Sequence, residues 1–539
     1  MLWLSAAVWL AACGAKVTTY HVTVVDAACS GPSPLGSGAT TVDSFRFTVT
    51  GDNMAPIVVK ASYGSHSASV GNIPAGGNRV IEVRAYAGTT LVSLGRTVPF
   101  AVPDTVPETN TAVDVTVFLR PVGQFTQPNV AATPNTCAHM TVARAGHSAT
   151  VLNDGRVFIA GGYQVDVSGH PTATQTTEYY DPATGLFSAG PDIVLATGGG
   201  PDGGAFQSFP RAFHTAAMLT NGWVFLVGGE DYQDGGAVPQ ASNIIFVPDY
   251  FKYAGSPPYG TLPLNQPRSH AGVAVDAAGR VLVVGGYTYS GQVADQVEWY
   301  DPSSWTTAPQ SYVVTAPCDG GLPDGTDAGC PWSFPRAGMA MSAVQSGKYI
   351  AVAAGTDGTG LHTDVNFFSF GPSSFQASTQ AVTLAQARRE AGIAPFADLS
   401  QLILIGGYDT PSDSVGYGSV NTSEVISTSQ RFQVGPGPLV GQRGRACATR
   451  LLDGRVFSVG GRVSDLTGAP VSDGTVELIA PGSGVPTTLG QAPLAVPRWA
   501  HTCTTLNDGS VLVLGGVEEA GGQQTILQDA LIYMPQPLN

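Results

Sequence analysis

The chain has 539 residues, of which 43% are apolar and only 12% are charged, and its formal net charge is −15. The acidic balance excludes a nucleic-acid partner, because phosphate binding needs clustered Lys and Arg. The 68 glycines and 39 prolines are typical of many short strands joined by turns, and the length exceeds that of one ordinary domain.

The chain begins with an apolar segment that is too short to span a bilayer, and Leu10-Ala-Ala-Cys13 matches a bacterial lipobox. We predict that residues 1–13 are a lipoprotein signal peptide and that Cys13 carries the lipid. The alternative is an ordinary signal peptide with an incidental cysteine, and no Lys or Arg precedes the apolar run. Gly14 resembles the sorting case of the outer membrane. We therefore expect a lipoprotein of the bacterial cell envelope, facing the periplasm or the cell surface and attached to the membrane through its lipid anchor alone.

Residues 17–120 alternate apolar and polar side chains in short runs separated by Gly, Pro, Asn and Asp. This pattern is typical of half-buried antiparallel strands. It predicts a small β-sandwich, loosely similar to the immunoglobulin-like or prealbumin-like modules of surface lipoproteins. The predicted strands include Tyr20–Val25, Ser44–Thr50, Ile57–Ala61, Val80–Ala87 and Ala112–Leu119.

From about residue 137 the chain repeats one unit: an Arg, an apolar strand, a turn, a second strand ending in Gly-Gly, a variable loop and a short aromatic strand. Arg144-Ala-Gly-His147 followed by Gly161-Gly162, and Arg498-Trp-Ala-His501 followed by Gly515-Gly516, are the clearest copies. The other copies carry Gly228-Gly229, Gly285-Gly286, Ala354-Gly355, Gly406-Gly407 and Gly460-Gly461, which makes seven.

These repeats resemble the kelch repeat, and the resemblance covers residues 137–539. It implies a seven-bladed β-propeller, in which neighbouring blades bury the faces that no blade can bury alone. Ala530–Tyr533 looks like the third strand of the last unit, and no fourth strand follows it. We predict that a strand near residues 122–127 completes the seventh blade, so that the propeller extends over residues 121–539.

Each repeat carries an arginine that the resemblance places at the start of the inner strand. A ring of arginines near the channel could hold an anion, whereas a repeated arginine that ties blades together is the structural alternative, which we favour. The arginines are Arg144, Arg211, Arg268, Arg336, Arg389, Arg443 and Arg498. Arg211 and Arg336 stay among the candidate ligand-binding residues.

His147, His214 and His501 share one repeat position, which Met339 occupies in the fourth unit, and His270 is displaced by one place. A metal site needs three or four converging ligands, and repeat-equivalent residues converge only near the axis. We interpret these histidines as packing residues. The loops after the glycine pairs should gather on one face, where aromatic residues suit carbohydrate or protein contact. The candidates there are Tyr163, Tyr232, Tyr287 and Tyr408.

Six cysteines remain after Cys13, and an even number permits disulfides in an exported chain. Cys318 and Cys330 bracket one Gly/Asp-rich loop and are the predicted pair, while the pairing of Cys29, Cys137, Cys447 and Cys503 stays open. Asp319, Asp324 and Asp327 in that loop could hold calcium, but their spacing does not match an EF-hand.

The resemblance also includes galactose oxidase, whose propeller holds copper through Tyr and His and whose further C-terminal domain supplies a ligand. No such Tyr and His set can be carried over to this chain, and we expect neither that further domain nor a cofactor. The favoured function is therefore a non-catalytic binding or scaffold module for a protein or a glycan. The alternative is a kelch-class enzyme, either a copper oxidoreductase or a sugar mutarotase.

Overall fold

The prediction of an all-β protein is confirmed by the computed structural model, in which the described residues form strands and two short 3-10 helices, η1 (Gly38–Thr40) and η2 (Tyr63–Ser65). Neither the signal segment with Cys13 nor the loop with Cys318, Asp319, Asp324 and Asp327 belongs to the described residues. No helix among the described residues is long and apolar enough to cross a bilayer. The structure describes residues 17–538 except 105–112, 197–205, 234–235, 249–251, 254–261, 290, 303–311, 314, 317–329, 332–333, 372–373, 379–380, 398–399, 414–417, 430–431, 440, 466, 482–487 and 491–492.

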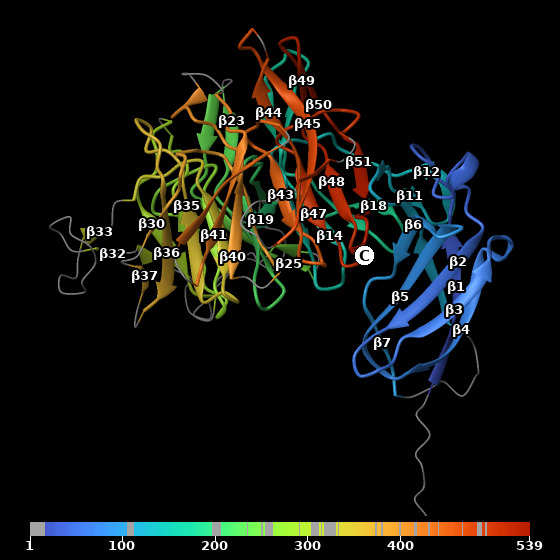
Figure 1. Ribbon diagram of the computed structural model, residues 1–539. Coiled ribbons are helices and arrows are strands. Elements are labelled where there is room, and N and C mark those ends of the chain that lie inside the picture. Colours follow the sequence, from blue (N-terminus) through green and yellow to red (C-terminus); the bar gives the residue numbers. More distant parts are fainter. Residues whose placement is uncertain are drawn as a thin grey trace, which may run out of the picture. The chain divides into compact units, whose positions relative to one another are not determined.

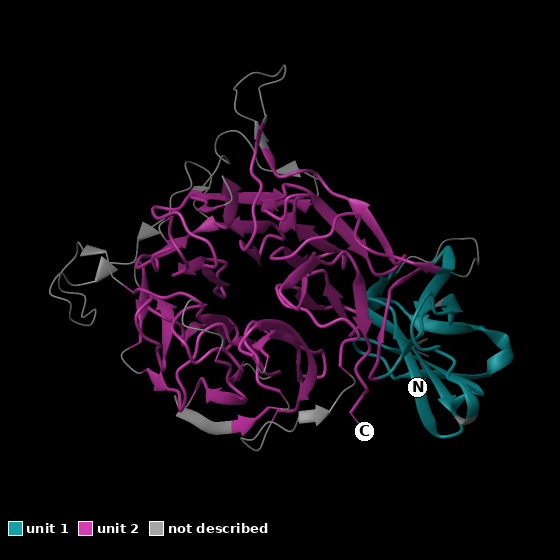
Figure 2. Cartoon of the chain, turned by 90° about the horizontal axis from the view of Figure 1, so that it is seen from above, with its two compact units in different colours: residues 1–122, 131–135 teal, residues 123–130, 136–539 magenta. Residues whose placement is uncertain are grey.

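The chain divides into two compact units, which are residues 1–122 with 131–135 and residues 123–130 with 136–539 (Figure 2). In the first unit, a sheet of order β4-β1-β8 and a sheet of order β3-β2-β5-β6-β9 share one apolar core, with Val22, Phe47 and Val83 fully buried. Its strands are β1 (Val17–Val25), β2 (Ser44–Thr50), β3 (Ile57–Ser62), β4 (Ser67–Pro74), β5 (Gly76–Ala87), β6 (Thr90–Arg96), β7 (Phe100–Val102), β8 (Val113–Phe118) and β9 (Arg120–Pro121).

The second unit is a β-propeller, and its described residues form seven sheets with a common core of four strands, here called blades 1 to 7 (Figures 1 and 2); a short fifth strand joins blades 2 and 4. Blade 1 comprises β13 (Ser148–Val151), β14 (Val157–Ala160), β17 (Thr177–Asp181) and β18 (Leu186–Ala189); blade 2, β21 (Thr215–Met218), β22 (Val224–Val227), β25 (Ser242–Val247) and β26 (Lys252–Tyr253); blade 3, β28 (Gly272–Val275), β29 (Val281–Val284), β30 (Val297–Tyr300) and β31 (Tyr312–Val313).

The remaining blades follow the same plan. Blade 4 comprises β34 (Ala340–Val344), β35 (Tyr349–Ala353), β36 (Asp364–Phe370) and β37 (Phe375–Ala377); blade 5, β39 (Gly392–Pro395), β40 (Gln401–Ile405), β41 (Thr422–Ser427) and β42 (Phe432–Pro438); blade 6, β43 (Cys447–Arg450), β44 (Val456–Ser464), β45 (Pro470–Ile479) and β46 (Thr488–Gly490); blade 7, β47 (Thr502–Thr505), β48 (Val511–Leu514), β51 (Ala530–Tyr533) and β10 (Phe125–Thr126).

The ring closes in the way that the sequence predicts. Strand β10 pairs antiparallel with β51, so that Phe125 lies opposite Tyr533 and Thr126 opposite Ile532. The first strands of successive blades contact one another in order, and β47 of blade 7 contacts β13 of blade 1. Blade 7 therefore takes its outer strand from the N-terminal side of the propeller, which covers an edge that would otherwise expose unpaired backbone groups.

The second strand of each blade explains why the blades stack. Successive side chains of a strand point to opposite faces, so a strand between two neighbours can be apolar throughout. In β14, Val157 and Ile159 pack against blade 7, whereas Phe158 and Ala160 pack against blade 2. Four two-stranded hairpins follow the glycine pairs of blades 1, 2, 6 and 7.

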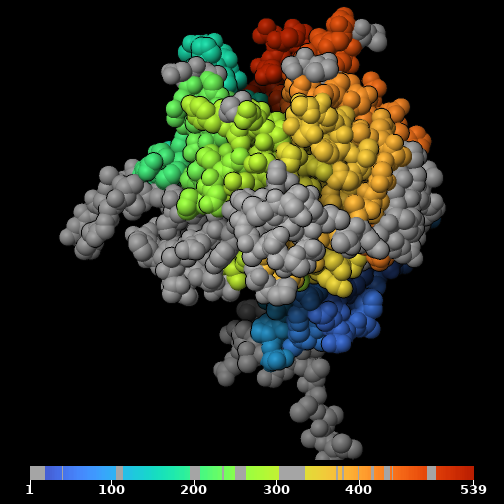
Figure 3. Space-filling view, turned by 90° about the vertical axis from the view of Figure 1, so that its left-hand side faces the viewer, coloured from blue at the N-terminus to red at the C-terminus, as the bar shows by residue number. Residues whose placement is uncertain are grey.

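These hairpins lie on one end of the ring, called here the upper face, and some of them project at the top of Figure 3, in teal, orange and red. They comprise β15 (Tyr163–Val165) and β16 (Pro171–Ala173), β23 (Glu230–Gln233) and β24 (Gly236–Pro239), the paired extensions of β44 and β45, and β49 (Val517–Ala520) and β50 (Gln523–Ile526). Further short strands are β11 (Asn129–Val130), β12 (Thr133–Cys137), β19 (Val194–Ala196), β20 (Phe206–Ser208), β27 (Leu262–Pro263), β32 (Thr315–Ala316), β33 (Cys330–Pro331) and β38 (Val382–Thr383).

Candidate functional site

A buried arginine holds each blade together internally. Arg144 donates from Nη1 to the carbonyl of Gly161 at 2.7 Å and from Nη2 to the carboxylate of Glu178 at 2.7 Å, and both partners belong to its own blade. The backbone carbonyl of Arg144 in turn accepts from the amide of Gly516 in blade 7 at 3.0 Å, and the same bond recurs at the other six arginines. The expectation that these arginines tie one blade to the next is therefore confirmed for the backbone, whereas the side chains bond within their own blade. In blade 5 the predicted member, Arg389, is wrong by one residue. The seven are Arg144, Arg211, Arg268, Arg336, Arg388, Arg443 and Arg498.

The two arginines proposed as ligand residues belong to this buried set. Arg211 is fully buried and donates to the carbonyls of Gly228 and Ser242, at 3.0 and 2.9 Å. Arg336 is 4% exposed and donates to the carbonyl of Ala354 at 2.8 Å and to the carboxylate of Asp364 at 2.6 Å. Neither side chain lines the axial pocket described below.

The residue two places after each buried arginine adopts a left-handed backbone conformation, with φ between 50° and 60°. Such a conformation costs a residue with a Cβ about 1 kcal/mol or more. Five of the seven nevertheless carry side chains, so the strain is tolerated repeatedly at one place in the fold. We call these seven positions the collar: Gly146, Phe213, His270, Gly338, Glu390, Arg445 and Ala500.

Backbone hydrogen bonds link collar residues of neighbouring blades. The amide of Phe213 donates to the carbonyl of Gly146 at 2.8 Å, and the amide of His270 donates to the carbonyl of Phe213 at 3.0 Å. The same link runs from Glu390 to Gly338 at 2.6 Å and from Arg445 to Glu390 at 2.9 Å. The collar therefore runs around the propeller axis from blade to blade and is fixed by its own backbone.

Each collar side chain in these links leans over the collar residue of the preceding blade. A Cβ on Gly146 would lie 2.9 Å from the ring of Phe213, and a Cβ on Gly338 would lie 2.9 Å from Cγ of Glu390. The two glycines thus leave room for the side chain that follows them. They begin two runs, one aromatic (Phe213 and His270) and one ionic (Glu390 and Arg445).

The aromatic run consists of stacked rings. Phe213 and His270 lie parallel, with centroids 4.4 Å apart and an interplanar angle of 17°. Tyr163 and Tyr287 approach them from the upper face, at 5.4 Å from Phe213 and 5.8 Å from His270. Burial lowers the pKa of His270, although the nearby carboxylate of Glu230 opposes the shift. At neutral pH the imidazole is therefore uncharged and presents an aromatic surface.

The ionic run is a bidentate pair. Nε and Nη2 of Arg445 both donate to the carboxylate of Glu390, and Nη2 also reaches Asp413 at 3.1 Å. Burial would raise the pKa of Glu390, but the charge of Arg445 outweighs it and holds that pKa at about 2. Glu390 is thus a carboxylate at any ordinary pH. Arg389, beside it, donates to Asp413 at 2.7 Å.

Trp499 follows the buried arginine of blade 7 and lies beside the ionic run. The guanidinium groups of Arg445 and Arg462 lie over its ring, at 5.3 and 4.7 Å from the centroid. Nε and Nη2 of Arg462 donate to the two carboxylate oxygens of Glu519, at 2.6 and 2.8 Å. Cation–π contact with two arginines fixes the plane of this indole.

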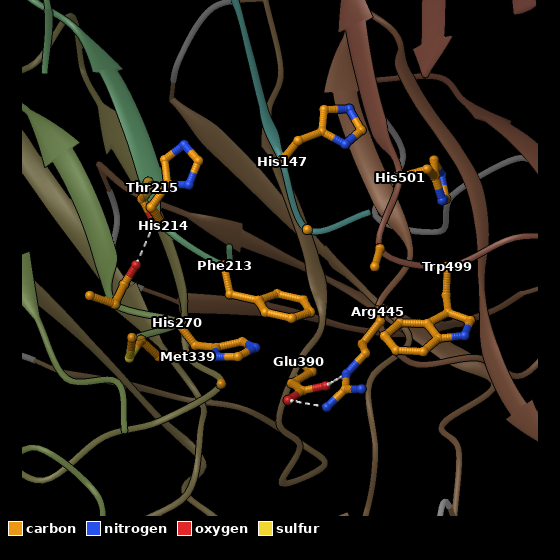
Figure 4. Close-up of a pocket in the computed structure, with 14 residues that line it drawn as sticks. His147, Phe213, His214, Thr215, His270, Met339, Glu390, Arg445, Trp499 and His501 are labelled. Carbon is orange, nitrogen blue, oxygen red and sulfur yellow. Dashed lines mark hydrogen bonds and ion pairs between the residues drawn. The ribbon is translucent and has the colours of Figure 1, made fainter. Parts of the chain in front are cut away.

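The collar and the next tier of residues enclose a cavity of about 320 Å³ on the propeller axis, called here the axial pocket (Figure 4). The aromatic run lies on one side of it, and Glu390, Arg445 and Trp499 lie on the other. A pocket of this size, with apolar walls and a few convergent polar groups, is typical of a small-molecule site. The tier beneath the collar includes His147, His214, Met339 and His501.

These histidines pack between blades, as the sequence predicts. A Cβ on Gly161, Gly460 or Gly515 would lie 2.9, 2.5 or 3.2 Å from the imidazole that the following blade supplies, and Met339 meets Gly285 in the same way. Burial lowers the pKa of His214 and His501 to about 3. His147 and His214 each meet a hydroxyl of the preceding blade, whereas neither ring nitrogen of His501 meets a hydrogen-bond partner in the described part of the chain.

The four tyrosines proposed from the loops lie above the pocket rather than in its wall. Tyr163 and Tyr232 come together, with ring centroids 6.1 Å apart, and Tyr232 donates to Glu230 at 2.8 Å. Tyr163 and Tyr408 are buried, whereas Tyr232 and Tyr287 are half-buried. Tyr408 lies in blade 5 and donates to the carbonyl of Arg462 at 3.1 Å. Tyr163, Tyr287 and Tyr408 follow glycine pairs and pair with the residue before the collar position of their own blade.

The collar residues Phe213, Glu390, Arg445 and the adjacent Trp499 were not among the predicted site residues. The sequence shows that each collar residue lies two places after the repeated arginine and that Trp499 lies one place after it. The sequence does not show that the collar position has a positive φ or that it faces the axis. Glycine at two of the seven collar positions is the one signal that could have indicated it.

Four cysteines of the described residues are disulfide-bonded. Cys447 and Cys503 form a disulfide between the inner strands of blades 6 and 7, and Cys29 and Cys137 are also disulfide-bonded. The predicted bridge of Cys330 to Cys318 involves a residue outside the described ranges. Within those ranges no three His, Cys, Asp or Glu side chains are grouped closely enough to share a metal ion.

Comparisons with known proteins do not assign this chain to a family. No protein-family model matches it, and no curated protein is significantly similar. Among solved structures, the protein YjhT is similar over 65% of this chain and 99% of its own, with 13% identity and a TM-score of 0.44. A fungal alcohol oxidase of the AA5 family, in complex with copper, is similar over 76% of each chain, with 18% identity and a TM-score of 0.49. At these levels neither likeness says what this chain binds.

Proposed function

We propose that the propeller is a carbohydrate-binding module and that the axial pocket is its ligand site. One observation carries the proposal: the collar places a stacked aromatic pair and a bidentate ion pair around the same cavity of about 320 Å³. A sugar ring has an apolar face of C–H groups and a rim of hydroxyls. The first suits an aromatic surface, and the second suits charged hydrogen-bonding groups.

We infer that the collar serves recognition in addition to joining neighbouring blades. Its side chains occupy strained left-handed positions, which cluster at functional sites because the surrounding structure must over-determine them. Backbone hydrogen bonds between neighbouring collar residues also help to keep the pocket in one shape, which reduces the ordering cost of binding. The half-buried tyrosines of the upper face, Tyr232 and Tyr287, would extend the contact for a longer glycan, with the buried Tyr163 packed beside Phe213 and Tyr232.

The proposed setting is the bacterial cell envelope. Lipidation of Cys13 would attach the protein to a membrane, with the outer membrane as the proposed location and a glycan or a protein as the partner. This part of the proposal rests on the lipobox in the sequence alone.

The test is a glycan array with purified protein, followed by calorimetric titration of the best ligand. Phe213→Ala should weaken binding at least tenfold, whereas Tyr289→Ala, which removes an exposed aromatic of the upper face outside the pocket, should not. Metal content and hydrogen peroxide production on sugar alcohols should be measured on the same sample. Stoichiometric copper with peroxide production, or anomer interconversion of a free sugar, would establish the enzyme alternative instead. An array without a glycan that depends on Phe213 would overturn the proposed site.

A further inference from the structure

The arginines around the axial pocket are already bound to carboxylates of the chain. Arg445 is held by Glu390 and Asp413, Arg389 by Asp413, and Arg462 by Glu519. Among these residues, only Arg445 and Glu390 line the pocket. Their side chains are 22% and 10% exposed, so the pair lies at the boundary between the pocket and the protein interior.

Glu390 meets Arg445 in the geometry that a ligand carboxylate would use. Two nitrogens of the guanidinium face its two carboxylate oxygens, which is the usual fork by which arginine recognises a free carboxylate. Its backbone is held at φ 52° by the collar, and Gly338 leaves the space in which its side chain lies. The chain thus places its own carboxylate where an acidic ligand would bind.

We propose that Glu390 occupies the anion position of the axial pocket and that the pocket therefore selects uncharged sugars against sugar acids. This inference rests on the proposed function and adds the class of ligand. An acidic sugar that took both of these guanidinium nitrogens would have to displace Glu390, which would leave a carboxylate largely removed from water with only Arg389, 3.4 Å away, as its cation. A neutral sugar can instead donate to Glu390 and accept from Arg445 while the pair stays intact.

The charges around Arg445 also disfavour an anionic ligand. Four carboxylates of the described residues, Glu230, Glu390, Asp413 and Glu519, pair with or lie beside the three arginines and His270, although only Glu390 among the four lines the pocket. His270, opposite the ion pair, is close to Glu230, with Nδ1 3.9 Å from a carboxylate oxygen. An added anion at Arg445 therefore meets three arginines that each already have a carboxylate partner.

Glu390→Gln tests the inference, because glutamine keeps the shape of the side chain and removes the charge. The probes are glucose and galactose with the matching glucuronate and galacturonate, titrated by calorimetry. The wild type should bind a neutral hexose at least tenfold more tightly than its acid. Glu390→Gln should bind the acid at least tenfold more tightly than the wild type does.

Two further variants control for unspecific effects of a freed arginine. Glu519→Gln removes the partner of Arg462, which stacks on the same Trp499 but does not line the pocket, and it should create no anion site. Arg445→Gln in the Glu390→Gln background should abolish the gain. Melting temperatures of all variants show whether each one is folded.

The outcomes separate this inference from the proposed function. Equal or tighter binding of the uronic acids by the wild type overturns the inference and leaves the carbohydrate site standing. If the wild type binds no sugar, the proposed function fails, and acetate becomes the probe. Acetate should then raise the melting temperature of Glu390→Gln but not that of the wild type or of the double variant, and a flat response in Glu390→Gln overturns the inference.

Discussion

Phe125 lies opposite Tyr533 in antiparallel register, with ring centroids 5.1 Å apart, although one residue precedes the first blade and the other belongs to the last. The ring of Phe125 also meets Phe457 of blade 6 at 6.4 Å. This contact joins the N-terminal side of the propeller to its C-terminal blade.

Removal of this strand should therefore open the propeller. A variant that lacks residues 1–127 loses β10, whereas one that lacks residues 1–122 keeps Gly123, whose amide bonds the carbonyl of Met534 at 2.8 Å. We expect the shorter truncation to unfold several degrees higher in a calorimetric scan, because only the longer one exposes the edge of β51. Identical melting temperatures would contradict closure by β10.

Substitution of two glycines can distinguish the effect of backbone strain from the effect of a change in the shape of the pocket. Gly146→Ala and Gly169→Ala both place a Cβ on a left-handed residue, but only at Gly146 does that Cβ meet a neighbour, the ring of Phe213. Both should lose about 1 kcal/mol of unfolding free energy from the strain. In a sugar titration, only Gly146→Ala should weaken binding, because it displaces the aromatic run; equal weakening by both would argue against that run.

The buried histidines should make the protein less stable in mild acid. Burial holds the pKa of His501 at about 3, below the ordinary value of 6.5, so between these pH values the unfolded chain binds a proton that the folded one excludes. Stability is then lost as the pH falls. His501→Met, which copies Met339 of blade 4, should recover about 2 kcal/mol at pH 5 relative to pH 8 in urea titrations.

A matched control for this experiment is His170→Met, because the side chain of His170 is 67% exposed. It should leave the pH dependence of unfolding as it is in the wild type. A pH profile of His501→Met that parallels the wild type would show that this imidazole does not contribute to acid sensitivity.

Adjacent arginines in blade 5 should differ sharply in their effect on stability. Arg388→Met leaves the fully buried carboxylate of Glu424 without its cation and should cost about 3 to 5 kcal/mol. Arg389→Met removes a partner of Asp413, which is 38% exposed, and of Glu390, but both carboxylates keep Arg445, so the loss should be smaller, about 1 to 2 kcal/mol. Denaturant midpoints measure both, and a larger loss for Arg389→Met would reverse the assignment.

Arg388 and Arg389 also show where inference from the sequence ends. The glycine pairs, the strands before them and the closing strand β10 could be predicted, because turn residues and alternating apolar residues mark them directly. Both are buried, and which of them bonds the glycine carbonyl and the carboxylate of its blade depends on a register that one sequence does not display. The axial pocket was not predicted for a related reason. Phe213, Glu390 and Arg445 belong to no motif in the sequence, and their left-handed backbone conformation brings them to one cavity.

The closing strand also has a consequence for the order of folding. Strand β10 is synthesised before any blade, yet its partner β51 emerges only after the other strands of the seven blades. Until then blade 7 lacks its outer strand and the ring cannot shut. Contacts between segments so distant in sequence are slow to form, and the intermediate with an open edge is prone to aggregation. The rate of ring closure, more than the strength of any blade, should therefore limit how much native protein a cell can accumulate.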